Sequence, residues 1–299
     1  MTRSLGGSEL AATIRHDASV AAAALTEMGI QPKLAVVLAT ADESTAWYVR
    51  SIAGAAKRTG ILCDVVDLGP DATTEQIHST LVDLGHDPDV HGVILQTPLP
   101  KGTDLDILRE AITPDKDIDG ANPVSLGRLI AHLPAFAPAT AQAVLALLDF
   151  HDVDLPGKTA TVVGRSTVVG IPAAHLLVQR DATVTVCHRH TADLIAGVRS
   201  ADIVVVAAGI PGLITAEHIA DGAIVIDVGT TATDDGELLG DVDAASVAGR
   251  AGALTPVPGG VGPVTTALLL NHTVDAATTQ SARRRAEKTM KLVGLPGND

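Results

Sequence analysis

The sequence predicts an α/β protein of two domains, each built around a parallel sheet. From Leu34 onward, short apolar runs alternate with helix-like segments, which is typical of parallel strands joined by helices. The runs consist mainly of Val, Ile, Leu and Ala, as expected for strands that are buried on both faces. A chain of 299 residues has room for two domains of roughly 100–200 residues each.

Seven apolar segments are predicted to be strands, with helices in most of the intervals. In chain order they are residues 33–39, 62–69, 90–96, 159–164, 183–188, 201–209 and 222–229. A helix over about residues 8–29 is expected to pack on the first sheet, and a last helix is expected from Thr265 to Lys291.

The domain boundary is placed near residue 140, where the segment LPAFAPAT leads into a helix rich in Ala and Leu. The first predicted domain covers residues 1–140 and is completed by residues 265–299. The second predicted domain covers residues 141–264.

Composition and charge exclude several classes of partner. The net charge of −14 disfavours nucleic acid and anionic membranes. No apolar run approaches the ~18 residues of a membrane span, and the N-terminus lacks a secretory signal, so a cytoplasmic location is expected.

Cys63 and Cys187 lie within strand-like runs and are expected to be buried structural residues, and no metal site is predicted. The basic run ARRRAEK near the C-terminus is interpreted as a solvated helix end.

A phosphate-binding turn is predicted in the segment TATVVGRSTVVGIPAAHLL. A buried strand, a glycine turn and a helix follow one another there, which is how a dinucleotide pyrophosphate meets backbone amides at a helix N-terminus. Gly164 opens the turn, and Gly170 allows the helix to approach the strand closely. Ser166 replaces the central glycine of the usual G-x-G-x-x-G pattern, so the motif depends on its position after a strand.

The residues after the next strand favour NADP over NAD. An NAD-specific fold usually carries Asp or Glu there to hold the ribose hydroxyls, but this chain has His188, Arg189 and His190. A cationic group suits a 2′-phosphate, and Arg165 in the turn adds a second guanidinium. The alternative is a solvated surface loop that happens to be basic.

Two further segments place polar residues where ligands bind in parallel sheets. Gln96 ends a buried strand ahead of a proline-bracketed loop, at the carboxyl edge of the first sheet. Asp119 precedes Gly120 in the segment PDKDIDGANPVSLGRL. On local grounds this Asp-Gly pair is equally well an ordinary turn.

The chain carries a series of motifs that resembles the methylenetetrahydrofolate dehydrogenase/cyclohydrolase family. The resemblance covers roughly residues 30–275 and is most specific in the block from Thr255 to Thr265. The motifs are, in order, QTPLP, PDKDIDG, GRSTVVGIP, CHRHT, ADIVVVAAG, GDVD and TPVPGGVGPVTTALLL.

The resemblance implies two α/β domains flanking a cleft: an N-terminal catalytic domain that binds folate and a C-terminal Rossmann-like domain that binds NADP. It implies a last helix that returns to the first domain and a homodimer formed through the cofactor domain. The implied reaction is oxidation of methylenetetrahydrofolate to the methenyl form with NADP, followed in many members by hydrolysis to formyltetrahydrofolate.

The same resemblance implies roles for individual residues. Tyr48 matches the tyrosine that stacks on folate, Gln96 the glutamine near the one-carbon unit, and Asp119 the aspartate that holds the pterin. The segment from Pro256 to Pro263 matches the loop beside both ligands. The residues expected to bind substrate there are Pro258, Gly259 and Gly260, and those expected to bind the cofactor are Gly164, Arg165, Ser166, Gly170, His188, Arg189 and Thr230.

One residue departs from the family pattern in a way that bears on chemistry. The family helix carries Tyr-x-x-x-Lys, but the fourth residue after Tyr48 is Ile52. At about 100° per residue, Lys57 and Arg50 fall about 180° and 200° from the tyrosine and cannot replace that lysine. Hydride transfer involves no proton transfer at this site. Attack of water on the methenyl carbon, in contrast, is accelerated by a positioned acid or base. The sequence therefore predicts a dehydrogenase with weak or absent cyclohydrolase activity.

Two other interpretations stay open. The segments TADEST before Tyr48 and PATA at residues 138–141 also depart from the family pattern, so the enzyme could act on a different one-carbon carrier. The chain could also be a non-catalytic or regulatory protein, although retention of Tyr48, Gln96 and Asp119 argues against this. A short-chain dehydrogenase is rejected, because the lysine is absent and the nucleotide turn follows the tyrosine.

Overall fold

The computed structural model describes residues 1–233 and 236–293, with side chains as far as Met290. The chain forms two compact units, each assembled from separate stretches of sequence. Unit 1 comprises residues 1–14, 129–133 and 137–268, and unit 2 comprises residues 15–128, 134–136 and 269–299. The first residues of the chain therefore group with the second half of the sequence, whereas the predicted first domain began at residue 1. Helices α1 (Ser8–Glu27) and α10 (Val261–Val293) each contain residues of both units.

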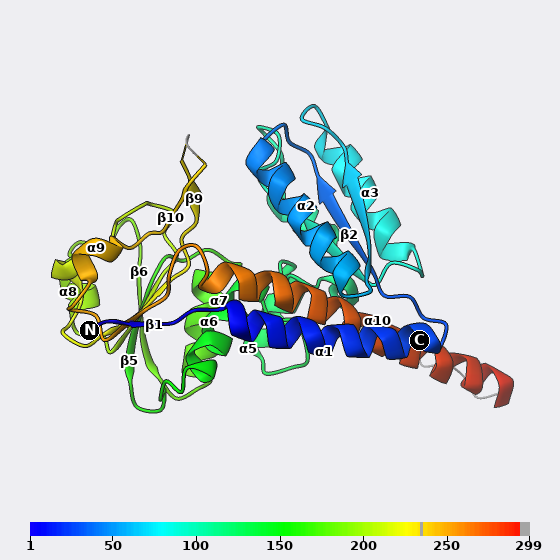
Figure 1. The fold of residues 1–299 in the computed structure, drawn as a ribbon. Coiled ribbons are helices and arrows are strands. Elements are labelled where there is room, and N and C mark those ends of the chain that lie inside the picture. The colour runs from blue at the N-terminus through cyan, green and yellow to red at the C-terminus, as the bar shows by residue number, and fades with distance from the viewer. Residues whose placement is uncertain (234–235, 294–299) are drawn as a thin grey trace. The chain divides into compact units, whose positions relative to one another are not determined.

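Unit 2 is built on a three-stranded parallel sheet in the order β3-β2-β4. Its strands are β2 (Lys33–Leu38), β3 (Leu62–Asp67) and β4 (Gly92–Leu95). Val37 pairs with Val66 of β3 and with Leu95 of β4, so the three carboxyl ends meet at one edge. Figure 1 shows helices α2 (Glu43–Arg58) and α3 (Thr74–His86) beside strand β2.

Helices α2 and α3 of unit 2 begin at residues whose side chains accept from their first amides. The Asp42 carboxylate accepts from the amide of Thr45 at 2.7 Å at the start of α2. Thr73 and Gln76 form a reciprocal capping box at the start of α3. The elements are α2 (Glu43–Arg58), α3 (Thr74–His86), α4 (Leu105–Ala111), the 3-10 helix η1 (Pro114–Lys116) and α5 (Pro123–Ile130), which ends in unit 1.

Unit 1 is built on a six-stranded sheet in the order β6-β5-β7-β8-β11-β1, and all its strand pairs are parallel. Strands β6 and β7 lie on opposite sides of β5, so the chain reverses its winding direction there, and ligands in such sheets bind at this position. The strands are β1 (Arg3–Ser4), β5 (Thr159–Val163), β6 (Thr183–Cys187), β7 (Ile203–Val206), β8 (Ile224–Asp227) and β11 (Ala253–Leu254).

Shorter elements complete unit 1. The helices are α6 (Ala139–Phe150), α7 (Gly170–Val178), α8 (Leu194–Arg199), η2 (Ala216–His218) and α9 (Ala244–Val247). Two short antiparallel strands, β9 (Thr231–Ala232) and β10 (Leu238–Leu239), form a separate hairpin.

Each unit has its own hydrophobic core between sheet and helices. In unit 2 the core includes Val37 and Val93 of the sheet with Ile77 and Leu81 of α3. In unit 1 it includes the strand residues Val204, Val206 and Val225. Full burial of one such side chain contributes about 1.5–3 kcal/mol, so these clusters stabilise the two sheets independently.

The predicted pattern of strands is confirmed, since all seven apolar segments contain a strand. The last helix is also present and is somewhat longer than predicted. Both cysteines are free thiols; Cys187 is buried as expected, and Cys63 is partly exposed. Within the described residues, no helix combines the length and apolarity needed to cross a membrane.

Candidate functional site

The turn between β5 and α7 has the close backbone packing of a phosphate-binding loop. Gly164 has a φ of +126°, and a Cβ there would lie 2.1 Å from the carbonyl oxygen of Ala207. A Cβ on Gly170 would lie 2.2 Å from the carbonyl oxygen of Gly164. Both positions therefore require glycine, which lets the start of α7 pack tightly against the end of β5 and the loop after β7.

Ser166 has a structural role in the same turn. Its hydroxyl oxygen accepts from the amide of Val169 at 3.1 Å and from that of Gly170 at 3.4 Å. The first turn of α7 is thus ordered by a side chain where the usual motif has a glycine. Arg165 and Ser166 are both exposed, so they can reach a ligand at this edge.

The cationic loop after β6 lies beside this turn. Val163 and Cys187 are register partners, and the amide of Gly164 donates to the carbonyl of Cys187 at 2.8 Å. His188 is half-buried, and its Nδ1 accepts from the amide of His190 at 3.2 Å. Arg189 is exposed, and neither it nor Arg165 forms an ion pair within the described residues. Two guanidiniums are therefore available next to the turn from Gly164 to Gly170. This combination fits the binding of a phosphorylated dinucleotide.

Two buried carboxylates, Asp227 and Asp241, lie at the carboxyl ends of β7 and β8, and the sequence predicted no role for either. Asp227 ends β8 and accepts from the amides of Gly229, Asp241 and Val242 at 2.9–3.0 Å. The Oδ2 atom of Asp241 accepts from the amides of Ala208 and Gly209 at 2.7 and 2.8 Å. These bonds fix the loops after β7 and β8.

The two carboxylates differ in how completely they are satisfied. Burial raises the pKa of Asp227 to about 6, the three amides oppose this rise, and the neighbouring Asp241 adds to it. Oδ1 of Asp241 is buried without a hydrogen-bond partner in the described part of the chain. Asp227, with Thr255 and Val257, lines a pocket of about 370 Å³ near the carboxyl ends of β8 and β11. Thr230, the last predicted cofactor residue, is exposed just beyond β8.

The loop after β11 contains the predicted residues Pro258, Gly259 and Gly260. Gly259 has a φ of +107°, and its carbonyl accepts from the amide of Gly7 at 2.8 Å. A Cβ on Gly7 would lie 2.1 Å from the carbonyl oxygen of Gly260. The N-terminal segment therefore packs directly against this loop, within unit 1.

The residues predicted to bind folate gather at the carboxyl edge of the unit 2 sheet. Gln96 directly follows β4, and its side-chain amide donates to the carbonyl of Thr97 at 3.0 Å. An isolated parallel bridge between Val93 and Asp117 brings the Asp119 turn next to β4. Tyr48 lies in the second turn of α2, the helix that follows the carboxyl end of β2. Tyr48, Gln96 and Asp119 are all half-buried.

Ile52, which the sequence predicts to stand at the position of the family lysine, faces the interior of the protein. The buried positions of α2 are Thr45, Val49, Ile52, Ala55 and Ala56, which form one face of the helix. Ile52 is 0% exposed. Arg50 and Lys57 are exposed and lie off this face, as predicted from the helical spacing. No cationic side chain of α2 therefore occupies the predicted position of a base.

Two ionisable residues beside Asp119 turn out to be buried. The Asp117 carboxylate accepts from the amides of Ala121 and Asn122, both at 2.9 Å, and burial still raises its pKa. The Lys116 ammonium donates to the carbonyls of Leu84 and Asp87 at 2.9 and 2.6 Å. These contacts hold the Asp-Gly turn in place, so the turn is a fixed platform at the sheet edge.

Comparison with known proteins identifies the family. Residues 5–119 match the model of the tetrahydrofolate dehydrogenase/cyclohydrolase catalytic domain, and residues 138–281 match that of the NAD(P)-binding domain of the same enzymes. The chain belongs to this family. The predicted family resemblance and the two-domain α/β fold with a Rossmann-like cofactor domain are thereby confirmed.

Individual members of the family are similar over nearly the whole chain. "Bifunctional protein FolD 1" of Rhodococcus jostii is 80% identical over 97% of this chain and 98% of its own length. The FolD structure from Campylobacter jejuni is 38% identical, has a TM-score of 0.90, and covers 93% of this chain and 99% of its own. The Trypanosoma brucei FolD structure, solved with NADP cofactor and an inhibitor, is 37% identical with a TM-score of 0.89, over 94% and 99% of the two chains.

The family domains divide the predicted site residues. Tyr48, Gln96 and Asp119 fall within the catalytic-domain match, and every predicted cofactor residue falls within the NAD(P)-binding match. The loop at Pro258 also lies in the NAD(P)-binding match, although its residues were predicted to contact substrate. The roles of the individual residues stay predictions.

Proposed function

We propose that this chain oxidises methylenetetrahydrofolate to methenyltetrahydrofolate with NADP, and that it hydrolyses the methenyl product weakly or not at all. One observation carries the proposal: the phosphate turn and its cations are complete, whereas a buried isoleucine stands four residues after Tyr48. Family membership and an NADP-bound relative support the oxidation itself.

Unit 1 supplies the residues for the cofactor. The tight turn from Gly164 to Gly170 receives the pyrophosphate ahead of α7, and the exposed Arg165 and Arg189 hold the 2′-phosphate. The carboxylates of Asp227 and Asp241 keep the neighbouring loops in place. The bound cofactor supplies a nicotinamide ring that accepts a hydride.

Unit 2 supplies the residues for the folate. The ring of Tyr48 stacks on the pterin, Asp119 holds its amino and amide groups, and Gln96 lies near the one-carbon bridge. The methylene carbon loses a hydride and becomes the methenyl cation, so no proton moves to or from the protein. Placement is therefore sufficient for this step, and half-buried side chains on rigid elements provide it.

Hydrolysis has a different requirement. Water adds to the methenyl carbon and a proton must leave, so a positioned base accelerates the step. The buried side chain of Ile52 cannot accept or donate a proton. The cytoplasmic location and the homodimer remain predictions from the sequence.

A paired assay on one purified sample tests the proposal. Methenyl formation is followed with NADP and with NAD, and the decay of added methenyltetrahydrofolate is followed separately. We expect NADP-dependent oxidation with hydrolysis close to the uncatalysed rate. Absence of cofactor reduction despite NADP binding would support a non-catalytic protein instead. If oxidation is absent and folate analogues also fail to raise the melting temperature, a different one-carbon carrier becomes the better hypothesis.

A further inference from the structure

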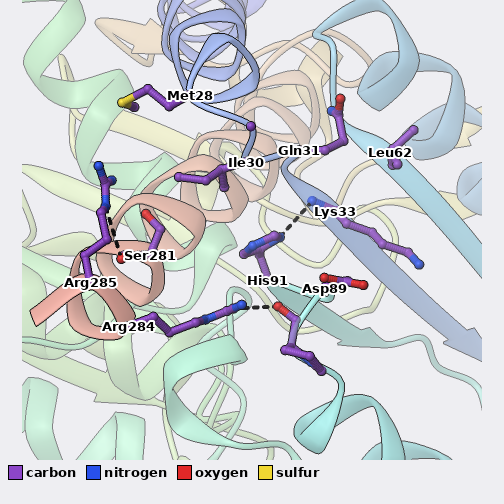
Figure 2. A pocket seen from close by; sticks show the side chains of 12 residues that line it. Met28, Ile30, Gln31, Lys33, Leu62, Asp89, His91, Ser281, Arg284 and Arg285 are labelled. Carbon is purple, nitrogen blue, oxygen red and sulfur yellow. Dashed lines mark hydrogen bonds between the residues drawn. The ribbon is translucent and has the colours of Figure 1, made fainter. Parts of the chain in front are cut away.

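A second pocket lies at the opposite edge of the unit 2 sheet from Gln96. It has a volume of about 560 Å³ and is lined by residues at the amino ends of β2 and β3, the loop before β4, and helix α10 (Figure 2). This volume is within the usual range of about 300–1,000 Å³ for small-molecule sites. Because β2 runs from Lys33 to Leu38, a ligand here would occupy the amino edge, away from the predicted folate residues.

The basic run of α10 contributes two unpaired guanidiniums to this pocket. Arg283 forms an ion pair with Asp115 and is not part of the lining. Arg284 donates to the carbonyl of Pro88 at 2.5 Å, and Arg285 donates to the carbonyl of Ser281 in its own helix at 3.4 Å. Neither of these two forms an ion pair with a carboxylate in the described residues. Their charge therefore remains available to a ligand.

The position of α10 beside the pocket is fixed by a buried side chain. The amide of Gln280 donates to the carbonyl of His91 at 2.9 Å and to that of Asp115 at 3.0 Å. Gln280 is buried, so these two bonds form away from water. The guanidiniums that follow on the next turn are thus attached to a rigid frame.

His91 adds a neutral donor to the same pocket. It is only 4% exposed, and Figure 2 shows its ring between the side chains of Ile30 and Arg284. Its Nδ1 accepts from the amide of Lys33 at 3.2 Å, so the neutral ring carries its proton on Nε2. Burial and the charges of Arg284 and Lys116 lower the pKa of His91 to about 4, which keeps the ring neutral. Within the described residues Nε2 has no hydrogen-bond partner, and His91 lines the pocket.

The remaining residues that line the pocket determine which chemical groups the rest of the ligand can carry. Lys33 is neutralised by Asp64 at 2.7 Å and adds no free charge. Met28, Ile30 and Leu62 offer apolar surface, while Asp89 can accept from a hydroxyl group. In a chain with a net charge of −14, two free guanidiniums beside one carboxylate make a local cationic site.

We propose that this pocket binds a small organic phosphate, with its phosphoryl oxygens on Arg284, Arg285 and Nε2–H of His91 and its apolar body against Ile30 and Leu62. A phosphoryl group offers three acceptor oxygens in different directions, which matches three donors from two segments, α10 and the loop before β4. A planar carboxylate has only two oxygens and matches them less well. The proposal does not depend on the proposed function, because none of these residues belongs to the predicted folate or NADP sites.

Calorimetric titration with phenyl phosphate at constant ionic strength tests the proposal. We expect wild-type protein to bind phenyl phosphate more tightly than benzoate. The double variant Arg284→Gln/Arg285→Gln is expected to weaken phenyl phosphate binding by at least about tenfold. The matched control Arg283→Gln/Lys288→Gln removes the same charge from the same helix outside the pocket and is expected to bind like wild type.

Two further variants separate the possible outcomes. Arg285→Gln alone removes a side chain bonded only to its own helix, so it tests the pocket without disturbing the fold. Arg165→Gln/Arg189→Gln removes the cations of unit 1 and is expected to leave phenyl phosphate binding intact. Loss of binding in this second variant, equal loss in the charge-matched control, or no loss in either pocket variant would overturn the proposal.

Discussion

The two units differ in the side chains they present at the carboxyl edges of their sheets. Unit 1 combines the exposed guanidiniums of Arg165 and Arg189 with the buried carboxylate of Asp227 at the end of β8. Unit 2 presents Tyr48, the neutral amide of Gln96 and the carboxylate of Asp119, and it keeps the aliphatic Ile52 in its interior. Under the proposed function, the cations of the first edge hold a multiply charged cofactor, whereas the second edge holds the folate ring and has no base at residue 52.

The first prediction, with the largest expected effect, concerns the variant Ile52→Lys of unit 2. It restores an ammonium four residues after Tyr48, and we expect methenyl hydrolysis to rise by about 10²–10⁴-fold, the usual contribution of a positioned acid or base. Hydride transfer is expected to stay within about tenfold of wild type, because it needs no proton. Both rates are measured on the same preparation, with thermal unfolding as a check that the buried charge is tolerated.

Ile52→Met is the control for this variant. Methionine has a similar length and no charge, so it should leave hydrolysis unchanged and cost little stability. The comparison fails if wild-type protein already hydrolyses the methenyl compound as fast as relatives that carry the lysine. It fails equally if a folded Ile52→Lys protein gains nothing.

The second prediction concerns the cations of unit 1. In Arg165→Gln/Arg189→Gln we expect the KM for NADP to rise by about 10²-fold, since two charge-assisted bonds to one phosphate are removed. The KM for NAD should change little, because NAD lacks that phosphate. Steady-state kinetics with both cofactors measure the ratio, and Arg199→Gln, a change outside the turn in the same unit, serves as the control. An equal loss for NAD and NADP would show that the arginines do not read the 2′-phosphate.

The regular elements of both units could be predicted from sequence because they follow local rules. The seven longer strands are short segments rich in Val, Ile, Leu and Ala, and glycines 164 and 170 stand at positions where the backbone leaves no room for a side chain. The two-residue strands β1 and β11 were missed, since so short a pairing leaves no periodic pattern.

The less predictable features depend on contacts between segments far apart in the chain. A hairpin separates Asp227 and Asp241 in the sequence. Their structural role is visible only in the fold, where their carboxylates accept from the amides of neighbouring loops. The basic run of α10 is exposed, as a solvated helix end should be. That Arg284 and Arg285 meet His91 in a pocket follows from tertiary packing and could not be read from the run itself.

The third prediction uses the buried base of unit 2. The pKa of His91 is lowered to about 4 in the folded protein from 6.5, so the unfolded chain takes up a proton first as pH falls. Stability contributed by the neutral ring is complete above pH 6.5 and is lost as the pH falls toward 4, by about 3 kcal/mol in total. In His91→Gln, which can still accept from the amide of Lys33, this slope should disappear. Native-state hydrogen exchange of β2 and β4 between pH 4 and 7 measures it, and identical slopes in both proteins would rule His91 out as the cause.

The fourth and smallest expected effect, in unit 1, has the opposite sign. The pKa of Asp227 is raised to about 6 from 3.8, so the folded protein holds a proton that the unfolded chain has already released. The stabilisation from this proton is complete below pH 3.8 and is lost as pH rises through 6, by about 3 kcal/mol.

The variant Asp227→Asn tests this expectation. Its side chain cannot ionise, but its amide nitrogen replaces the oxygen that accepts from the amide of Val242, at a cost that does not vary with pH. Relative to wild type, the variant should therefore gain stability between pH 4 and 7 in hydrogen exchange of β8, whereas the exposed Asp243→Asn should not. A parallel loss of stability with rising pH in wild type and Asp227→Asn would show that the Asp227 carboxylate is not its cause.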